Sequence, residues 1–275
     1  MIGSDRLDYI EENAYIPEHL IHYVTAVSQS QPFLIRDCPV YVKKESAILV
    51  GYPLKECFDE KQIKKALKEI SKQFKVKEIH LISPEISGPT AAPSDHYYRL
   101  TLPTLSISQK LRNMIHRAER EVSVKKVKIF NEEHRQLVRA FTESHPIGEE
   151  TRFIFERIPE YLSKGETAWV FEARDEKGSL IAFDIADFSS RHYAFYMFNF
   201  SSRGRYVPGA SDLLLMEVVK TAIEQGKEYV NLGLGISEGV SFFKKKWKAV
   251  AFLPYRFRLY PSVKAESMDA LFQKL

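Results

Sequence analysis

The spacing of apolar residues divides the chain into two successions of strands and helices. In the first, apolar runs bounded by polar turns predict four strands, at residues 32–37, 39–45, 47–54 and 78–83. Between the last two, apolar residues recur at helical spacing, which predicts a helix with Asp59 as its N-cap and Gln62 completing a capping box. The first thirty residues are expected to be helical.

The second succession begins beyond a loop rich in proline, glycine and serine at residues 85–95. A strand at 96–102 comes first, followed by a helix for which Ser106 is the expected N-cap. Beyond it the pattern predicts a strand, two helices, three strands, a helix, a strand, a short helix and a strand. These elements are expected at 122–130, 131–144, 149–163, 167–174, 179–188, 192–200, 211–226, 227–235, 237–247 and 250–260. The tail to Leu275 is expected to be a short helix.

Composition places the chain among globular proteins and narrows its chemistry. Hydrophobic residues make up 44% of the chain and charged residues 28%, and 275 residues can form one large or two ordinary domains. No apolar run is long enough to cross a bilayer and the N-terminus lacks a secretory signal pattern, so we expect a cytoplasmic protein. Cys38 and Cys57 are expected to be free thiols, and no spacing of Cys or His predicts a metal site.

The net charge of +4 is mild, but basic residues are concentrated in one segment. Between Lys110 and Lys128 there are seven Lys or Arg residues against two Glu. This segment is either the solvated face of a helix with a polar connector or a surface for a phosphate-rich partner. Such a partner could be the acceptor stem of a tRNA, a carrier protein or an anionic lipid surface.

The most informative stretch runs from residue 192 to residue 235, where a strand feeds a loop containing Gly, Arg and Pro and then a helix. This local geometry binds pyrophosphate, because the free N–H groups of the first helical turn and the helix dipole both favour an anion. Gly204 and Gly209 are expected to allow close approach or positive φ, while Arg203 and Arg205 add charged donors. The alternative is an ordinary strand–turn–helix.

The order of these elements and several short motifs resemble the GNAT acyltransferase fold. The usual GNAT loop is Q/R-x-x-G-x-G/A, and the segment from Arg205 to Ala210 departs from it by one extra residue and a single final Gly. The chain is more similar to FemABX-like aminoacyltransferases and to the C-terminal domain of phosphatidylglycerol lysyltransferase. The matching residues are Gly209-Ala210-Ser211, Leu213-Leu214-Leu215, Ala222 and Gly226, Asn231-Leu232-Gly233, Gly239 with Phe243-Lys244, and Lys110, Arg112 and Arg117 in the preceding helix.

This resemblance implies an α/β fold with a mixed sheet, in which two GNAT-like lobes follow one another. A degenerate lobe with a bridging helix is expected at residues 1–121 and a complete one at 122–275, and only the last 180 residues match well. The resemblance implies transfer of an acyl group from acyl-CoA, or from the phosphopantetheine arm of an acyl carrier protein, to an amine by direct attack. The alternatives are an aminoacyl-tRNA-dependent enzyme of the FemX or lysyltransferase type and a catalytically silent binding protein.

The same resemblance places the acyl donor on the loop and on the strands beside it. The expected donor-binding residues are Phe198, Asn199, Phe200, Arg203, Gly204, Arg205, Tyr206, Val207, Pro208, Gly209, Ala210, Asn231 and Lys244. For residues 198–200 the expectation concerns backbone N–H groups that a splayed strand leaves free. Asn231 could instead pair with neighbouring backbone, and Lys245 and Lys246 are expected to be solvated.

Three residues are candidates for proton transfer: Asp184, Asp187 and Tyr196. In a regular strand Asp184 and Asp187 point to opposite faces, so only one can face a cleft unless a bulge intervenes. An Asp buried without a partner has a raised pKa, which suits a base. The other interpretation is that one Asp lies in solvent at the strand end and the other pairs with an Arg. Glu149, Glu150 and Arg152 could line the acceptor side.

Overall fold

The structure is a computed structural model that describes residues 3–55, 57–85, 95–103 and 106–261. Within these ranges, eleven strands join in one mixed sheet, in the order β1-β2-β3-β4-β11-β5-β10-β9-β8-β7-β6. The strands are β1 (Gln31–Ile35), β2 (Cys38–Lys43), β3 (Ser46–Val50), β4 (Glu78–Ser83), β5 (Asp95–Thr101), β6 (Val122–Val127), β7 (Ala168–Asp175), β8 (Leu180–Asp187), β9 (Tyr193–Ser201), β10 (Tyr229–Leu234) and β11 (Val250–Pro261). The helices are α1 (Ser4–Glu12), η1 (Pro17–His19), α2 (Ile21–Ser28), α3 (Glu60–Gln73), α4 (Gln109–Ala118), α5 (Glu132–Ser144), α6 (Glu149–Glu156), α7 (Ile158–Lys164), α8 (Ala210–Glu224) and α9 (Glu238–Lys246).

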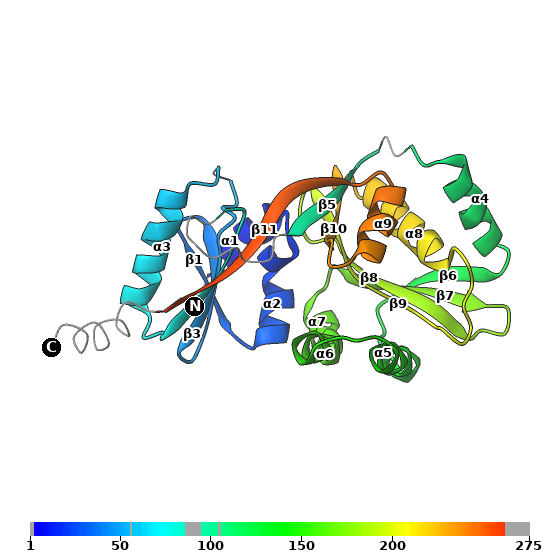
Figure 1. Cartoon of the computed structure of the whole chain (residues 1–275), viewed down its shortest axis with the longest axis horizontal. Helices are drawn as coiled ribbons and strands as arrows, with labels where there is room; N and C mark the ends of the chain where they lie inside the picture. The colour runs from blue at the N-terminus through cyan, green and yellow to red at the C-terminus, as the bar shows by residue number, and fades with distance from the viewer. Residues whose placement is uncertain (1–2, 56, 86–94, 104–105, 262–275) are drawn as a thin grey trace.

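Two lobes lie side by side along this sheet (Figure 1). The N-terminal lobe comprises α1 to β4, and its amphipathic helix α3 buries Ile63, Ala66 and Ile70 against one face of the strands. The C-terminal lobe comprises β5 to α9; α4, α8 and α9 lie on one face of its strands and α5, α6 and α7 on the other (Figure 1). Helices α1 and α2 lie between the lobes (Figure 1). There α2 packs against α7 of the C-terminal lobe.

One long strand, β11, belongs to both lobes. Residues 250–255 of β11 pair with β5, and residues 256–261 pair with β4. The chain thus returns from the C-terminal lobe to complete the sheet of the N-terminal one (Figure 1). The predicted fold class, a mixed α/β sheet in two lobes, is confirmed. The boundary predicted at residue 121 remains a prediction, although β5 and α4 pack in the core of the C-terminal lobe, with Leu100 and Leu111 buried there.

The hydrogen bonds that cap α3 and α4 differ in part from the prediction. Asp59 caps α3 as predicted, but its side chain accepts only from the amide of Lys61, and Gln62 accepts from Arg36 instead of closing a capping box. Ser108, and not Ser106, caps α4 and accepts from the amide of Leu111. The predictions were therefore right about the elements and wrong about these hydrogen bonds.

Two further elements end earlier than predicted. The helix predicted at 149–163 is two helices in the structure, and the second one starts at Ile158. Pro159 lies in the first turn of this second helix, where a missing N–H is tolerated. The strand predicted at 122–130 ends at Val127. The helix predicted for the tail lies outside the described residues.

A buried ion pair connects the two lobes through α2. His22 Nε2 lies 2.7 Å from Asp187 Oδ2, and His22 Nδ1 lies 3.3 Å from Glu11. Burial alone would lower the pKa of His22, but the hydrogen bonds to the two carboxylates outweigh it and raise this pKa to about 9. Burial opposes ionisation of Asp187 as well, and His22 nevertheless lowers the Asp187 pKa to about 2. The pair is therefore charged across the physiological range.

We expect His22→Gln to destabilise the protein in a pH-dependent way. Because the folded-state pKa of His22 is raised above its usual value of 6.5, its contribution to stability is complete below pH 6.5 and is lost as the pH rises through about 9. The loss in the free energy of unfolding should be larger at pH 6 than at pH 9.5 by up to roughly 3 kcal/mol. Urea denaturation of both proteins at the two pH values measures this difference.

The matched control is His192→Gln, which removes an exposed pair with Glu228 at 2.8 Å. An exposed pair contributes little, so this variant should stay within about 0.5 kcal/mol of the wild type at both pH values. An equal loss for His22→Gln at pH 6 and pH 9.5 would contradict the assigned charge state.

Candidate functional site

Strands β9 and β10 are paired at one end and then separate. Their parallel pairing ends where Asn231 lies opposite Phe195. Beyond this point β10 follows β5, and β9 follows β8 up to Ser201. Within the described chain, the edge of β9 that faces β10 therefore has no strand partner after Phe195. Backbone N–H and C=O groups at such an edge can bind a ligand in place of a strand.

A β-bulge lies at the separation. Ile185 is opposite Phe198 and Ala186 is opposite Tyr196, which leaves Met197 as an extra residue in β9. Bulges re-aim the side chains that follow them. Tyr196 and Asn199 consequently both face α8, although they are three residues apart in a strand. The side chains of Phe198 and Phe200 point to the opposite face and pack in an aromatic cluster with Phe155.

Four polar side chains meet between this part of β9 and the start of α8. Asn199 Nδ2 donates to Asp184 Oδ1 at 2.5 Å and to Ser211 Oγ at 3.2 Å. Tyr196 lies beside Asp184, but neither Tyr196 Oη nor Asp184 Oδ2 has a hydrogen-bond partner of good geometry among the described residues. Unsatisfied buried polar atoms are rare in folded proteins, and they often mark functional sites.

The electrostatic environment of Asp184 favours its neutral form. Its side chain is fully buried, and burial raises the pKa of its carboxyl well above the usual value despite the hydrogen bond from Asn199. Burial and the neighbouring Asp184 likewise raise the pKa of Tyr196. This carboxyl therefore binds a proton far more readily than an exposed aspartate does.

Asp187 lies on the other face of β8, as the spacing predicted. The interpretation that one Asp is solvated and the other pairs with an Arg is wrong, because both are fully buried and, in the described part of the chain, neither pairs with an Arg. Tyr161 and Thr167 donate to Asp187, in addition to His22. Of the two aspartates, only Asp184 lies on the face that carries α8.

The loop from Arg203 to Ala210 leads from β9 to the start of α8. Arg203, Gly204, Arg205 and Tyr206 are exposed, Val207 and Pro208 are half-buried, and Gly209 and Ala210 are buried. The amide of Ala210 donates to Val207, whereas the amides of Ser211 and Asp212 have no backbone acceptor within the described residues. The first turn of α8 thus retains free N–H groups beside exposed guanidinium groups, which together suit an anion.

Gly209 is required where α8 begins. Its φ is +88°, and a Cβ at this position would lie 2.7 Å from the carbonyl oxygen of Met114 in α4. Glycine therefore allows the start of α8 to contact α4. Gly204 does not have a positive φ, and a Cβ there would meet open space in the protein, so that its close approach to a ligand stays a prediction.

Asp212, which sequence reasoning missed, attaches α9 to the first turn of α8. It accepts hydrogen bonds from Trp247 Nε1 at 2.9 Å and from Lys246 Nζ at 2.8 Å. The expectation that Lys246 is solvated is therefore wrong. A carboxylate in a first helical turn is common because of the helix dipole, so the sequence contained no signal for this partner.

This attachment places Lys244 at the end of β10, beyond the separation. Lys244 is 4% exposed, and its ammonium donates to the carbonyl of Leu234. Burial lowers the pKa of Lys244 to about 7, so the residue changes charge near neutral pH. Asn231, in contrast, faces the N-terminal lobe, donates to the carbonyl of Tyr15 at 2.7 Å and accepts from the amide of Gly233. Its contacts agree with the interpretation that it pairs with backbone.

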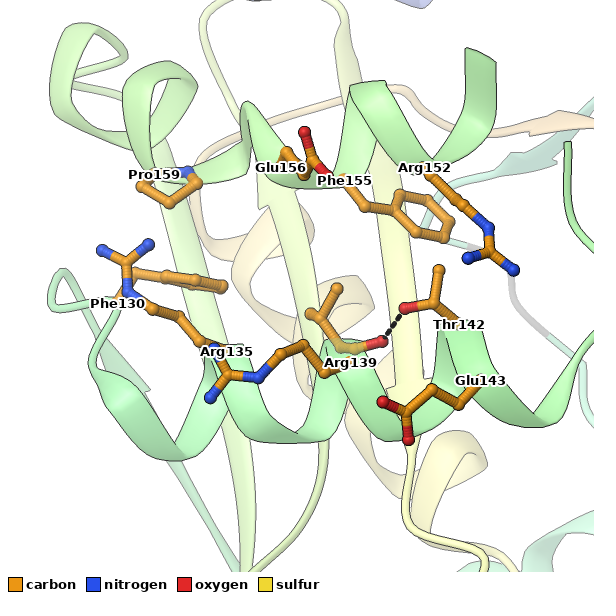
Figure 2. A pocket seen from close by; sticks show the side chains of 10 residues that line it. Phe130, Arg135, Arg139, Thr142, Glu143, Arg152, Phe155, Glu156 and Pro159 are labelled. Atoms are coloured by element: carbon orange, nitrogen blue, oxygen red, sulfur yellow. Dashed lines mark hydrogen bonds between the residues drawn. The ribbon is translucent and has the colours of Figure 1, made fainter. Parts of the chain in front are cut away.

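A groove of about 410 Å³ lies on the opposite face, between α5 and the helices α6 and α7 (Figure 2). Its apolar lining includes Phe130, Val138 and Phe155. Arg152, one of the residues expected on the acceptor side, lies at one end of the groove, whereas Glu149 and Glu150 are not among its lining residues (Figure 2). The groove and the loop are neighbours, because Arg203 Nη2 lies 3.3 Å from His145 Nε2, directly after α5.

The described residues lack two further features. No group of three or more His, Cys, Asp or Glu side chains there could hold a metal ion. No helix in the same ranges has both the length and the apolar composition needed to span a bilayer.

Comparison with solved structures identifies the class of fold, a two-lobed GNAT-like architecture. L-PGS from Bacillus licheniformis is similar over 98% of this chain and 95% of its own, with 15% identity and a TM-score of 0.61. FemX is similar over 100% of this chain and 98% of its own, with 13% identity and a TM-score of 0.60. A GCN5-related N-acetyltransferase from Kribbella flavida covers 90% of this chain and 98% of its own, with 12% identity and a TM-score of 0.52.

These similarities confirm the predicted resemblance at the level of the fold. No protein-family model and no curated protein sequence matches the chain. The roles of the individual residues therefore depend on the geometry described above.

We expect Gly209→Ala to destabilise the protein by roughly 1–3 kcal/mol, because an alanine there combines positive φ with a clash against Met114. Gly204→Ala is the matched control in the same loop and should change the free energy of unfolding by less than about 0.5 kcal/mol. Urea denaturation measures both. Equal effects of the two substitutions would show that α8 does not need this contact with α4.

Proposed function

We propose that this protein is a GNAT-type acyltransferase that transfers an acyl group from a phosphate-bearing donor to an amine. The observation that carries this proposal is the separation of β9 from β10 beside the exposed loop at the start of α8. An extended donor fits such an opening with its phosphates at the helix N-terminus and its acyl end beside the unpaired edge of β9. The two-lobed fold shared with L-PGS and FemX agrees with this function.

The donor is acyl-CoA, or an acyl carrier protein with the same phosphopantetheine arm. The exposed side chain of Arg205 forms no hydrogen bond or ion pair with the described residues, although it contributes to lowering the pKa of Glu133, so its N–H donors are free to bind a phosphate. Arg203 stands two residues away and is also exposed. The backbone groups of residues 198–200 bind the pantetheine arm or the acyl carbonyl. Lys244, at the end of β10, adds a positive charge below about pH 7.

The group of Asp184, Tyr196, Asn199 and Ser211 moves the proton. The amine nitrogen attacks the carbonyl carbon of the thioester, the carbon–sulfur bond breaks, and the proton released by the amine is delivered to the leaving thiolate. In its ionised form Asp184 accepts that proton, directly or through Tyr196, and then passes it to the thiolate sulfur; burial raises its pKa, which makes the carboxylate a stronger base. Asp187 instead holds α2 against the C-terminal lobe through His22.

A second candidate donor is aminoacyl-tRNA. Two observations favour it: the fold similarity to FemX and L-PGS, and the seven exposed basic residues between Lys110 and Lys128. These basic side chains lie on α4 and β6 or shortly after them, and α4 contacts the start of α8 through Met114 and Gly209. A nucleic acid bound along α4 would thus reach the same loop.

We expect saturating CoA to raise the melting temperature of the wild type, and Arg205→Ala to weaken CoA binding by about tenfold or more. The reason is the loss of one charged hydrogen bond to a phosphate. The measurement is a thermal-shift titration at near-physiological salt, where nonspecific attraction of polyanions is screened. Arg6→Ala, at an exposed arginine of α1, is the matched control and should bind CoA like the wild type.

The same titration with charged and uncharged tRNA separates the two donors. Saturable stabilisation by CoA supports the first donor, and binding that prefers aminoacylated tRNA supports the second. If the melting temperature responds to neither ligand, the transferase proposal is contradicted and a binding protein is favoured.

We expect Asp184→Asn to lower the rate of acyl transfer at least about 100-fold while leaving the affinity for CoA within twofold. The amide keeps the size of the side chain but cannot accept the proton. The assay follows thiol release from acetyl-CoA in the presence of a panel of primary amines. Asp187→Asn is the matched comparison, and it should reduce the free energy of unfolding rather than the rate. Similar rates for Asp184→Asn and the wild type would exclude Asp184 as the base.

A further inference from the structure

A second cavity, of about 360 Å³, lies between the two lobes. Its lining residues are Tyr15, Tyr52, Pro53, Phe58 and Pro84 from the N-terminal lobe and Arg99, Tyr193, Phe252 and Leu253 from the strands β5, β9 and β11. The cavity is thus formed jointly by the two lobes. We refer to it as the interlobe pocket.

Arg99 is the charged group of the interlobe pocket, and none of the described carboxylates pairs with it. It is partly buried, and its Nη1 donates to the hydroxyl of Tyr193 at 2.8 Å. Its guanidinium carbon lies 4.4 Å from the ring centroid of Tyr229 and 4.8 Å from that of Phe252. No carboxylate among the described residues forms an ion pair with Arg99, its Nε is buried without a partner, and its Nη2 has no hydrogen bond to those residues.

Arg174 in β7, another partly buried arginine of the sheet, is in a different situation. Arg174 is similarly shielded, with 16% of its side chain exposed, and it pairs with both Glu172 and Glu133. A cation removed from water without a partner is costly, so buried charges are normally paired. Contacts with aromatic faces and one neutral hydroxyl offset only part of that cost for Arg99.

The walls of the interlobe pocket are aromatic, and their polar groups are already used. The hydroxyl of Tyr15 donates to the carbonyl of Pro53, and that of Tyr52 donates to the carbonyl of Pro254. The hydroxyl of Tyr193 accepts from Arg99. Among these groups, Arg99 and the hydroxyl of Tyr193 each have a donor without an acceptor among the described residues, and the rings around them offer flat apolar surfaces for stacking.

We propose that the interlobe pocket binds a small organic anion, namely a carboxylate or phosphate group carried on a flat apolar body. The anionic group binds Nη2 of Arg99, and the body lies among the rings of Tyr15, Tyr52 and Phe252. The volume admits a ligand of roughly a dozen non-hydrogen atoms, such as phenyl phosphate. This binding activity goes beyond the proposed acyl transfer and does not depend on it.

The position of the pocket relates it to the separated strands. Arg99 is opposite Asn231, which is the last residue of β10 paired with β9. With a strand spacing of about 4.8 Å, Arg99 lies roughly 10 Å from Phe195, across two strands. A ligand here would therefore lie close to the point where β9 and β10 separate, on the face covered by the N-terminal lobe.

Isothermal titration of the full-length protein with matched probes tests the proposal. Phenyl phosphate and benzoate carry the proposed charge on a ring, and benzyl alcohol has a similar ring without a charge. In the wild type, at least one charged probe should bind saturably and at least tenfold more tightly than benzyl alcohol. The stronger of the two charged probes identifies the preferred acidic group. If neither binds tenfold more tightly than benzyl alcohol, the proposal is wrong, and this comparison needs no variant.

Substitutions then assign the binding to Arg99. Arg99→Gln should lose at least tenfold in affinity for the charged probe and leave the weak binding of benzyl alcohol unchanged. Arg99→Lys keeps the charge and should retain affinity within about fivefold, which covers the case in which Arg99→Gln fails to fold. Arg120→Gln, at an exposed arginine beyond α4, is the matched control and should bind like the wild type. Wild-type affinity in a folded Arg99→Gln, or loss of affinity in a folded Arg99→Lys equal to that in Arg99→Gln, would overturn the assignment.

Discussion

The separation of β9 from β10 is the constraint on which the candidate site depends. Each strand keeps one partner, β8 for β9 and β5 for β10, so the two diverge without leaving the sheet. The bulge at Met197 bends β9 away from β10 and turns Asn199 toward α8. On the other face, Ala14 and Leu20 of the N-terminal lobe pack on Phe195, where the pairing ends. The opening between β9 and β10 is consequently closed at one end by the N-terminal lobe. At its other end it is open toward the loop at the start of α8.

The N-terminal lobe therefore acts as a structural part of the site and not as a separate unit. Strand β11 joins it to the C-terminal lobe by backbone hydrogen bonds on both edges. The pair of His22 and Asp187 joins the same two lobes by a buried charge interaction on the face of β8 that faces α2. Moving α2 away would separate His22 from Asp187 and leave a buried charge without its partner, which is costly. The pair therefore also fixes the position of α2. The wall over Phe195 and the interlobe pocket both follow from these two connections.

Local spacing predicted most of the fold but few of the contacts that form the site. The positions of α3, α8 and β9 followed from periodicity, and the need for glycine at residue 209 followed from its place before a helix. The bulge at Met197 was not predictable, because it depends on the register with β8. Asp212 and Lys246 pair across 34 residues, and His22 and Asp187 across 165, so neither pair leaves a trace in local sequence. Such contacts depend on topology, and periodicity carries no information about it.

Asp184 and Asp187 show how far the surroundings decide the chemistry of identical side chains. They lie three residues apart in one strand, and both are fully buried. Asp187 faces the imidazolium of His22, and its pKa is lowered to about 2. Burial raises the pKa of Asp184 and nearby Asp212 adds to the rise, because its neutral neighbours Asn199 and Tyr196 only partly offset the cost of burying the charge. The first carboxylate is committed to holding the lobes together, because its charge is already compensated. Asp184 has the higher affinity for a proton. It also lies beside the opening between the strands, where an attacking amine must release a proton.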